Sequence, residues 1–315
     1  MLLTVLIPTY RRPKDLARCL KALEKQIRLA DEVIIIVRDT DIDTKNFLDT
    51  PNLTTLHLRI VTVTATGVVA AMNAGLDVAQ GDIIAITDDD AAPHPDWLSR
   101  IEAYFRADEH LGGVGGRDWL YLGTQLCEAD THPGASQNIG RLMWFGKVIG
   151  NHHIGKGEPR EVDVLKGVNS SYRRIALEKV RFDDRLLGTG AQVYWELALC
   201  LKLKRLGWKL IYDPAIAVDH YLAPRFDEDL RFQFNPVAFF NEVHNETSII
   251  IEHFPLQQKI VFVLWAVFVG TRRSFGLVQL LRFLPTEGKV ALEKWSISLR
   301  ARLQGYKTWQ RSNCS

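Results

Sequence analysis

The first 110 residues carry short apolar runs separated by longer segments with helical periodicity. Residues 2–7 (LLTVLI), 33–37 (VIIIV) and 83–87 (IIAIT) form almost continuous apolar runs, which predict strands buried on both faces. Residues 56–64 alternate in part and predict a further strand. Four strands at this spacing, with helical segments between them, are typical of a mostly parallel α/β sheet.

The segments between these runs have the spacing of helices. Apolar residues recur every three or four positions from Pro13, which suits a first helical turn, to Ile27. Residues 68–80 are rich in alanine, and Gly81 is placed to cap the end of that helix. Residues 96–107 predict another helix.

The pattern loosens after Leu111. Four glycines between residues 112 and 116 interrupt it, and residues 121–159 lack firm periodicity, as expected of a binding loop or lid. Regular structure is then expected at three places: a strand at 162–165, a helix at 193–206 ended by Gly207, and two short strands within 208–218. From about Pro236 the chain is helical and rich in aromatic residues.

Composition narrows the class of protein. The 315 residues are 47% hydrophobic and 24% charged, which is ordinary for a globular protein and unlike a disordered chain. The net charge of +2 is spread along the chain, so no nucleic-acid partner is expected. The four cysteines form no C-x-x-C pair and predict free thiols in a reducing compartment: Cys19, Cys127, Cys200 and Cys314.

Two apolar segments invite a membrane interpretation. The N-terminal run has no basic residues before it and is interrupted by Pro8, so it predicts a strand and not a secretory signal. The longest apolar run, 260–270, is shorter than the roughly 20 residues that span a bilayer as a helix. These features predict a cytoplasmic protein.

Three consecutive carboxylates follow the strand at 83–87. Asp88, Asp89 and Asp90 therefore lie where ligands gather in an open α/β sheet, at the carboxyl end of a strand. Positions 88 and 90 point to the same side of an extended chain, and paired carboxylates suit Mg²⁺ or Mn²⁺. Asp39 follows the strand at 33–37 and would approach the same rim. The alternative is a solvated turn before the helix at 96, and the position beside Asp39 favours the cation site.

Six segments in this order resemble the family 2 glycosyltransferases. The first four, VLIPTYRR, EVIIIVRD, AAMNAGLDVAQGDIIAITDDD and PDWL, resemble the half that binds the nucleotide sugar. GVNSSYRR and WELALCLKLKRLGWKLIYDPAIAVDH resemble the acceptor half, and together the segments span roughly residues 3–221. The resemblance implies a GT-A fold, which is Rossmann-like with a mostly parallel sheet and flanking helices. It also implies an inverting transfer of sugar from a nucleoside diphosphate to an acceptor hydroxyl, with Mn²⁺ or Mg²⁺ as cofactor.

The resemblance assigns a role to each matching residue on the donor side. The P-T-Y-x-R motif of the family falls on four residues that would border the nucleoside: Pro8, Thr9, Tyr10 and Arg12. Asp39 matches the carboxylate that accepts from the base. Asn73 falls on the A-R-N stretch of the family, where Met72 replaces the usual basic residue, so one cationic phosphate contact is lost or supplied elsewhere. Asp88 and its neighbour Asp89 would contact the donor.

The resemblance also assigns the metal ligands and the base. Asp90 would bind the metal directly, and His220 matches a histidine that coordinates the metal in some relatives; a structural histidine is the alternative. The E-D pair of the family falls on Trp195 and Glu196, so one carboxylate remains, and Glu196 is the expected catalytic base. A partly buried acid there would have a raised pKa, whereas the alternative is a surface residue of a helix. Two further acids are held in reserve as bases: Asp183 and Asp184.

These assignments define three parts of the chain: a nucleotide-sugar-binding half at 1–110, an acceptor-binding half of the same domain at 111–235, and a C-terminal helical appendage at 236–315. The run at 260–270 is apolar all round, which favours a buried cap, while the apolar and basic residues of 255–285 leave open a peripheral contact with the inner face of a membrane. The acceptor would be a saccharide or a lipid-linked saccharide, in polysaccharide, glycolipid or glycoprotein assembly.

Two other functions are considered beside sugar transfer. A nucleotidyltransferase also sets carboxylates and a metal against a nucleoside phosphate, but no glycine-rich phosphate loop follows the first strand. The eroded E-D pair keeps open a non-catalytic carbohydrate-binding or assembly protein on a GT-A scaffold.

Overall fold

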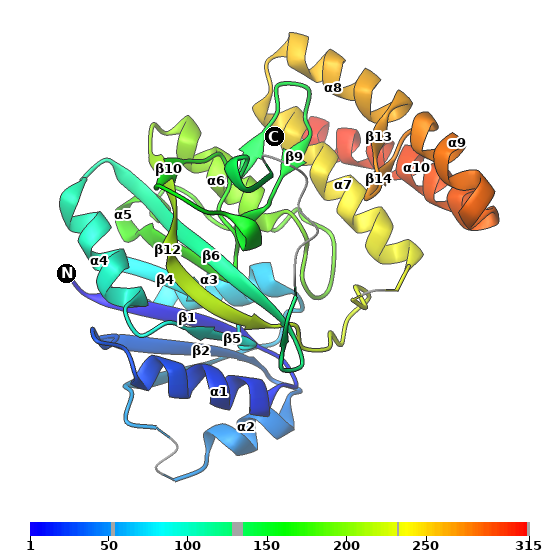
Figure 1. Ribbon diagram of the computed structural model, residues 1–315. Helices are drawn as coiled ribbons and strands as arrows, with labels where there is room; N and C mark the ends of the chain where they lie inside the picture. The colour runs from blue at the N-terminus through cyan, green and yellow to red at the C-terminus, as the bar shows by residue number, and fades with distance from the viewer. Residues whose placement is uncertain (52–53, 128–134, 232, 314–315) are drawn as a thin grey trace. The chain divides into compact units, whose positions relative to one another are not determined.

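The computed structural model describes all residues except 52–53, 128–134, 232 and 314–315, so Cys314 lies outside the described part. The chain divides into two units (Figure 1). The first comprises residues 1–141, 149–182 and 199–224, and the second comprises 142–148, 183–198 and 225–315. In the described part of the chain Cys19, Cys127 and Cys200 are free thiols, as predicted.

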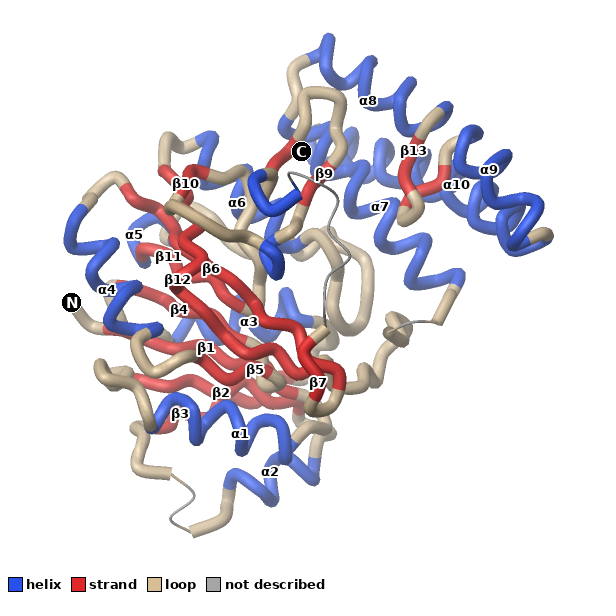
Figure 2. Tube along the Cα trace, in the orientation of Figure 1, coloured by secondary structure: helices blue, strands red, loops and turns tan. Residues whose placement is uncertain are grey.

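The first unit is built on one large mixed sheet (Figure 2). Its strands run in the spatial order β10-β12-β6-β11-β4-β1-β2-β3, with β5 paired to β12 and β7 to β6. Their bounds are β1 (Leu3–Thr9), β2 (Glu32–Arg38), β3 (Leu58–Val63), β4 (Ile83–Thr87), β5 (Ala91–Pro93), β6 (Leu111–Leu122), β7 (Gln125–Leu126), β10 (Arg160–Glu161), β11 (Asn169–Arg173) and β12 (Lys209–Tyr221). Strands β8 (Arg141–Leu142) and β9 (Val148–Ile149) form a separate pair.

Strands β1 to β4 form the parallel half that the sequence predicts. Helices cover both faces of this half, which explains why its strands are apolar throughout. Leu3, Val5 and Ile7 share a core with α1 (Pro13–Glu24) and α4 (Trp97–Ala107), and the opposite face, at Leu6, packs against α3 (Val68–Val78). The remaining helices that include residues of this unit are α2 (Ile42–Leu48), α5 (Arg174–Leu177) and α6 (Trp195–Arg205), besides short 3₁₀ turns.

Strand β6 contradicts the expectation that the glycines after Leu111 break regular structure. It is twelve residues long and pairs with both β11 and β12. A methyl group at Gly115 would lie 2.4 Å from the carbonyl oxygen of Asn169, and one at Gly116 would lie 1.7 Å from that of Ile216. Gly115 and Gly116 are therefore required because neighbouring backbone lies too close for any side chain.

Several smaller predictions also fail. Helix α1 ends at Glu24, and Ile27 is 76% exposed beyond it. Helix α3 ends at Val78, so Gly81 is not its C-terminal cap. Gly81 lies instead against the backbone of Thr4, and a methyl group at Gly81 would be 2.6 Å from the amide nitrogen of Thr4. The strand expected at 162–165 is absent from the described residues there, which lie between β10 and β11. The two pieces expected within 208–218 are one long strand, β12, with an irregularity between Asp213 and Ala217.

The second unit contains four long helices, as expected for the C-terminal region. They are α7 (Pro236–His253), α8 (Leu256–Phe268), α9 (Leu277–Glu287) and α10 (Lys289–Asn313). Asn235 caps α7 because its side-chain oxygen accepts from the amides of Val237 and Ala238. The core of this unit centres on Phe239, Val243 and Phe275. Helix α10 approaches α7 closely at Gly305, where a methyl group would lie 2.7 Å from the carbonyl oxygen of His244.

Helix α8 is not the buried cap that its apolar run favoured. Phe262 and Ala266 are fully buried, but Ile260, Leu264 and Phe268 are more than half exposed. Among the described helices none is both long enough and apolar enough to cross a membrane.

Candidate active site

The carboxyl ends of three parallel strands form the rim on which the site is built. In the pairing of β1 with β2, Thr9 lies opposite Val37, and Asp39 follows two residues later. In the pairing of β1 with β4, Leu6 lies opposite Ile86, and Asp88 follows two residues later. Asp39 and Asp88 therefore occupy the same rim of the sheet, on either side of the end of β1, as the sequence predicts.

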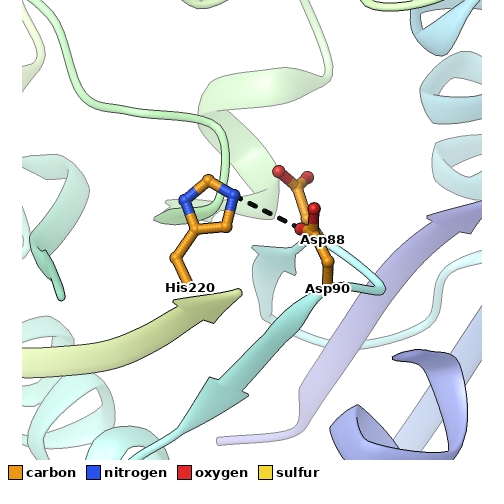
Figure 3. A group of neighbouring side chains, drawn as sticks. All are labelled: Asp88, Asp90 and His220. Carbon is orange, nitrogen blue, oxygen red and sulfur yellow. Dashed lines mark ion pairs between the residues drawn. The ribbon is translucent and has the colours of Figure 1, made fainter. Parts of the chain in front are cut away.

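Asp88, Asp90 and His220 converge at this rim (Figure 3). Each offers one ligand atom, and the three atoms lie within 4.8 Å of one another. Asp88 and Asp90 follow β4, whereas His220 lies on β12, which pairs with β5 so that His220 is opposite Ala91. The short strand β5 thus connects two segments that are 130 residues apart in the sequence.

The donor set fits a divalent cation. Mg²⁺ at its usual ligand distance separates neighbouring ligands by about 3 Å and opposite ligands by about 4 Å. The three atoms here lie within 4.8 Å of one another, so they need to approach only slightly to reach these separations. The imidazole of His220 is buried, and its Nε2 and Nδ1 lie 3.3 Å from Asp90 and 3.5 Å from Asp118. Within the described residues neither nitrogen makes a hydrogen bond. A buried imidazole of this kind is suited to a metal ion, which needs a lone pair and not a hydrogen bond.

The carboxylate of Asp89 contacts the end of β1 and the start of α1. Its carboxylate accepts a hydrogen bond of 2.8 Å from the hydroxyl of Thr9 and another of 2.8 Å from Arg12. Burial raises the pKa of Asp89 to about 7, while Arg12 opposes this shift and Asp90 adds to it. The guanidinium of Arg12 also lies 3.5 Å from Asp90 and donates to the carbonyl of Pro224. Thr9 and Arg12 therefore hold the acidic segment in place.

Two site residues were missed in the sequence, Asp118 on β6 and Lys166. Asp118 is fully buried, forms an ion pair with Lys166 and faces His220. Burial alone would raise the pKa of Asp118, but Lys166 and His220 outweigh it and hold the pKa well below its usual range. Burial lowers the pKa of His220, yet the carboxylates of Asp118 and Asp90 raise it overall. Asp118 thus lies next to Nδ1 of the imidazole, while Asp90 lies next to Nε2.

Replacing Lys166 by methionine is expected to destabilise the fold, because it leaves the buried carboxylate of Asp118 without its ammonium partner. Removing one partner of a fully buried pair costs about 3–5 kcal/mol, and we expect roughly 2 kcal/mol here since Lys166 is a third exposed. Urea unfolding measures the change. The double variant K166M/D118N should recover most of the loss, and equal stability of K166M and the wild type would contradict this account of the pair.

The nucleoside-side residues lie at or near the same rim. Tyr10 lies between two guanidinium groups, those of Arg11 and Arg38, each 5.1 Å from the centre of its ring. Arg11 has a left-handed backbone, with φ of 58°, in the turn between β1 and α1. Pro8 lies on β1, and Asp39 is half-exposed, its carbonyl accepting from Lys45. Their contacts with a nucleoside remain predictions.

Asn73, which the resemblance assigns to the donor, also bonds to the backbone of a distant segment. The side-chain amide of Asn73 donates to the carbonyl of Phe182 at 3.0 Å and accepts from its amide at 3.1 Å. Met72, at the position of the family's usual basic residue, is fully buried. The donor contact of Asn73 remains a prediction.

The expected base, Glu196, lies in the first turn of α6 and is half-buried. It belongs to the second unit. Of the two reserves, Asp183 is buried and bonded to Arg185, whereas Asp184 is exposed.

The mixed sheet, with an acidic segment at the end of β4 and a histidine on β12, has the arrangement of a GT-A transferase. The model of glycosyl transferase family 2 matches residues 4–181, more than half of the chain. The chain belongs to this family and is a glycosyltransferase. The resemblance of the sequence motifs is thereby confirmed.

Named relatives support the assignment. The chain is 29% identical to the glycosyltransferase AglE of Haloferax volcanii over 234 residues, which cover 73% of this chain and 70% of the relative. It is also 28% identical to chondroitin synthase of Escherichia coli over 120 residues, which cover 38% of this chain and 18% of that protein.

Solved structures of other glycosyltransferases share the fold. TarS of S. aureus, solved with UDP-GlcNAc, has a TM-score of 0.63 at 16% identity, covering 97% of this chain and 81% of that chain. The mannosyltransferase PcManGT of Pyrobaculum calidifontis, solved with GDP-Man and Mn²⁺, has a TM-score of 0.54 at 16% identity, covering 98% and 86%. These likenesses establish the GT-A fold.

Proposed function

We propose that this glycosyltransferase depends on a divalent cation, Mn²⁺ or Mg²⁺, and moves a sugar with inversion from a nucleoside-diphosphate donor to an acceptor hydroxyl. One observation carries the proposal. Asp88, Asp90 and His220 bring two carboxylates and a buried imidazole within 4.8 Å of one another at the rim where α/β sheets bind ligands. Solved GT-A structures with bound nucleotide sugar, or with nucleotide and Mn²⁺, support the choice of donor and cation.

The residues of the site have different proposed roles in binding the cation and the donor. When bound, a divalent cation supplies positive charge against the departing diphosphate. Asp90 and His220 would hold it, and Asp118 lies next to Nδ1 of the imidazole. Arg12 and Thr9 fix the backbone of the acidic segment through Asp89, so that Asp88 stays at the rim beside the donor. The side chains are thus positioned before the donor arrives, which lowers the cost of binding it.

Glu196 is proposed to take the proton of the acceptor hydroxyl as its oxygen attacks the anomeric carbon. Glu196 is the carboxylate that remains at the position of the family's E-D pair, and it lies half-buried in the first turn of α6. The acceptor is proposed to be a saccharide or a lipid-linked saccharide. Peripheral contact of residues 255–285 with the inner face of a membrane is part of the same proposal.

A nucleoside diphosphate together with Mn²⁺ is expected to raise the melting temperature. A ligand bound only by the folded state at 100 times its Kd contributes about 2.7 kcal/mol, which for a chain of this size is a rise of roughly 5 °C. Differential scanning fluorimetry with UDP, GDP and CDP, each with and without Mn²⁺, measures it. Slow hydrolysis of nucleotide sugars then identifies the donor.

The outcomes separate the candidate functions. Cation-dependent stabilisation followed by donor hydrolysis is the expected result. Stabilisation with no turnover of any donor or acceptor would instead indicate a carbohydrate-binding or assembly protein on this scaffold. Release of pyrophosphate from a nucleoside triphosphate would indicate a nucleotidyltransferase, and no response to any nucleotide would reject the proposal.

A further inference from the structure

Helices α8 and α9 expose apolar side chains to solvent along one side of each helix. On α8 the exposed residues recur at intervals of three and four, as the positions of one helical face do. On α9 the same spacing continues, while Leu280 on the other side is buried. We name these nine residues the α8–α9 face: Leu256, Ile260, Val263, Leu264, Phe268, Leu277, Val278, Leu281 and Leu284.

A tight hairpin joins the two helices and presents two cations. Strands β13 (Gly270–Thr271) and β14 (Ser274–Phe275) pair through two residues each. Phe275 is fully buried and anchors the hairpin in the core of the second unit, so Arg272 and Arg273 are exposed at its tip. Helices α8 and α9 follow one another along the same edge of this unit (Figure 1).

The segment that carries the α8–α9 face has a strongly one-sided charge. Residues 255–290 hold one acid, Glu287, which is paired with Lys294 at 2.6 Å, and five basic residues. The guanidinium groups of Arg272 and Arg282 lie 5.5 and 5.3 Å from the centre of the ring of Phe283, which holds both beside the exposed leucines of α9. The five basic residues are Lys259, Arg272, Arg273, Arg282 and Lys289.

We infer that the α8–α9 face binds the surface of an anionic lipid bilayer, with its apolar side chains among the acyl chains and its basic residues at the headgroups. Apolar side chains beside Lys and Arg are the features of helices that lie in a membrane interface. A symmetric contact with a second copy is disfavoured, because it would bring five cations against five with only Glu287 in return. The inference deepens the proposed function. One consequence rests on that function: a lipid-linked acceptor would reach the enzyme at this surface.

Flotation with vesicles tests the inference on the full chain. We expect binding to vesicles that contain phosphatidylglycerol, weakening with salt, and little binding to phosphatidylcholine alone. I260E/L264E, which replaces two residues 55% and 53% exposed, should weaken binding at least 20-fold. R272A/R273A should weaken it roughly 20-fold, since each basic residue near such a surface contributes about fivefold. The matched control is I175E/L206E, which replaces residues 59% and 51% exposed in the first unit and should bind as the wild type does.

Donor hydrolysis with Mn²⁺ is measured on the same samples. I260E/L264E should retain it, which shows that the variant is folded. If the wild type hydrolyses donor but does not bind anionic vesicles, the membrane inference is overturned and the proposed function is unaffected. If it binds vesicles but turns over no donor, the proposed function is overturned and the membrane inference is unaffected. The inference is also overturned if I260E/L264E binds vesicles as well as the wild type does. It is likewise overturned if the wild type is a dimer and I260E/L264E is a monomer.

Discussion

Replacing Asp90 by asparagine is expected to reduce sugar transfer roughly 1000-fold, about 4 kcal/mol of transition-state stabilisation. Asparagine keeps the volume and an acceptor for the amide of Ala223, which lies 3.1 Å from the carboxylate, but it removes the charge that a cation needs. The stabilisation by nucleoside diphosphate with Mn²⁺ should vanish as well. Single-turnover transfer and differential scanning fluorimetry measure the two effects.

An exposed aspartate of the same unit provides the matched control. Asp77 lies on α3 and forms a surface ion pair with Arg181, so Asp77→Asn should leave both transfer and the thermal shift unchanged. Asp90→Asn must also unfold in a single transition near the wild-type temperature, since a misfolded variant would lose activity for another reason. Normal Mn²⁺-dependent transfer by folded Asp90→Asn would refute the cation site.

Replacing Glu196 by glutamine should lower transfer by about 100- to 10,000-fold, the usual contribution of a general base. The amide has nearly the same shape but cannot accept the acceptor's proton. Binding of the donor should be unaffected, because the cation site lies on other residues, so the thermal shift with nucleoside diphosphate and Mn²⁺ is expected to persist. Transfer to a saccharide acceptor and the thermal shift, measured on one preparation, separate these effects.

Two further variants decide between Glu196 and the other acids. Glu178→Gln replaces an exposed glutamate and should behave as the wild type does. Asp184→Asn removes the reserve base that is exposed, and it should also retain transfer. If Asp184→Asn is inactive while Glu196→Gln transfers sugar normally, the base has been assigned to the wrong residue.

The parallel half of the fold was predictable because its signals are local. Strands β1, β2 and β4 are apolar runs, Pro13 marks the start of α1, and the acids follow directly at the end of β4. Strand β6 could not be recognised in this way. Gly115 and Gly116 are needed because backbone of β11 and β12, more than fifty residues away, lies against them, and composition alone makes such a segment resemble a loop.

The same distinction separates the site residues that were found from those that were missed. Asp88, Asp90 and His220 lie in motifs that can be read from neighbouring residues. Asp118 was missed because it follows the glycines of β6 and depends on Lys166, 48 positions later. Asn73 illustrates the converse. The resemblance assigns its side chain to the donor, yet the oxygen and the nitrogen of its amide group form hydrogen bonds with the backbone of Phe182, 109 positions away. No local pattern reveals that partner.

The crowded glycines of β6 have a practical consequence for mutational data. In a saturation scan scored by activity, Gly115 and Gly116 would resemble a catalytic motif, since almost any replacement there would abolish the signal. The reason is lack of space: at Gly116 even a methyl group would meet the carbonyl oxygen of Ile216 at 1.7 Å. Scoring protein abundance beside turnover would separate the two groups, because variants of Gly116 would disappear from the cell extract, whereas those of Asp90 would accumulate as inert protein.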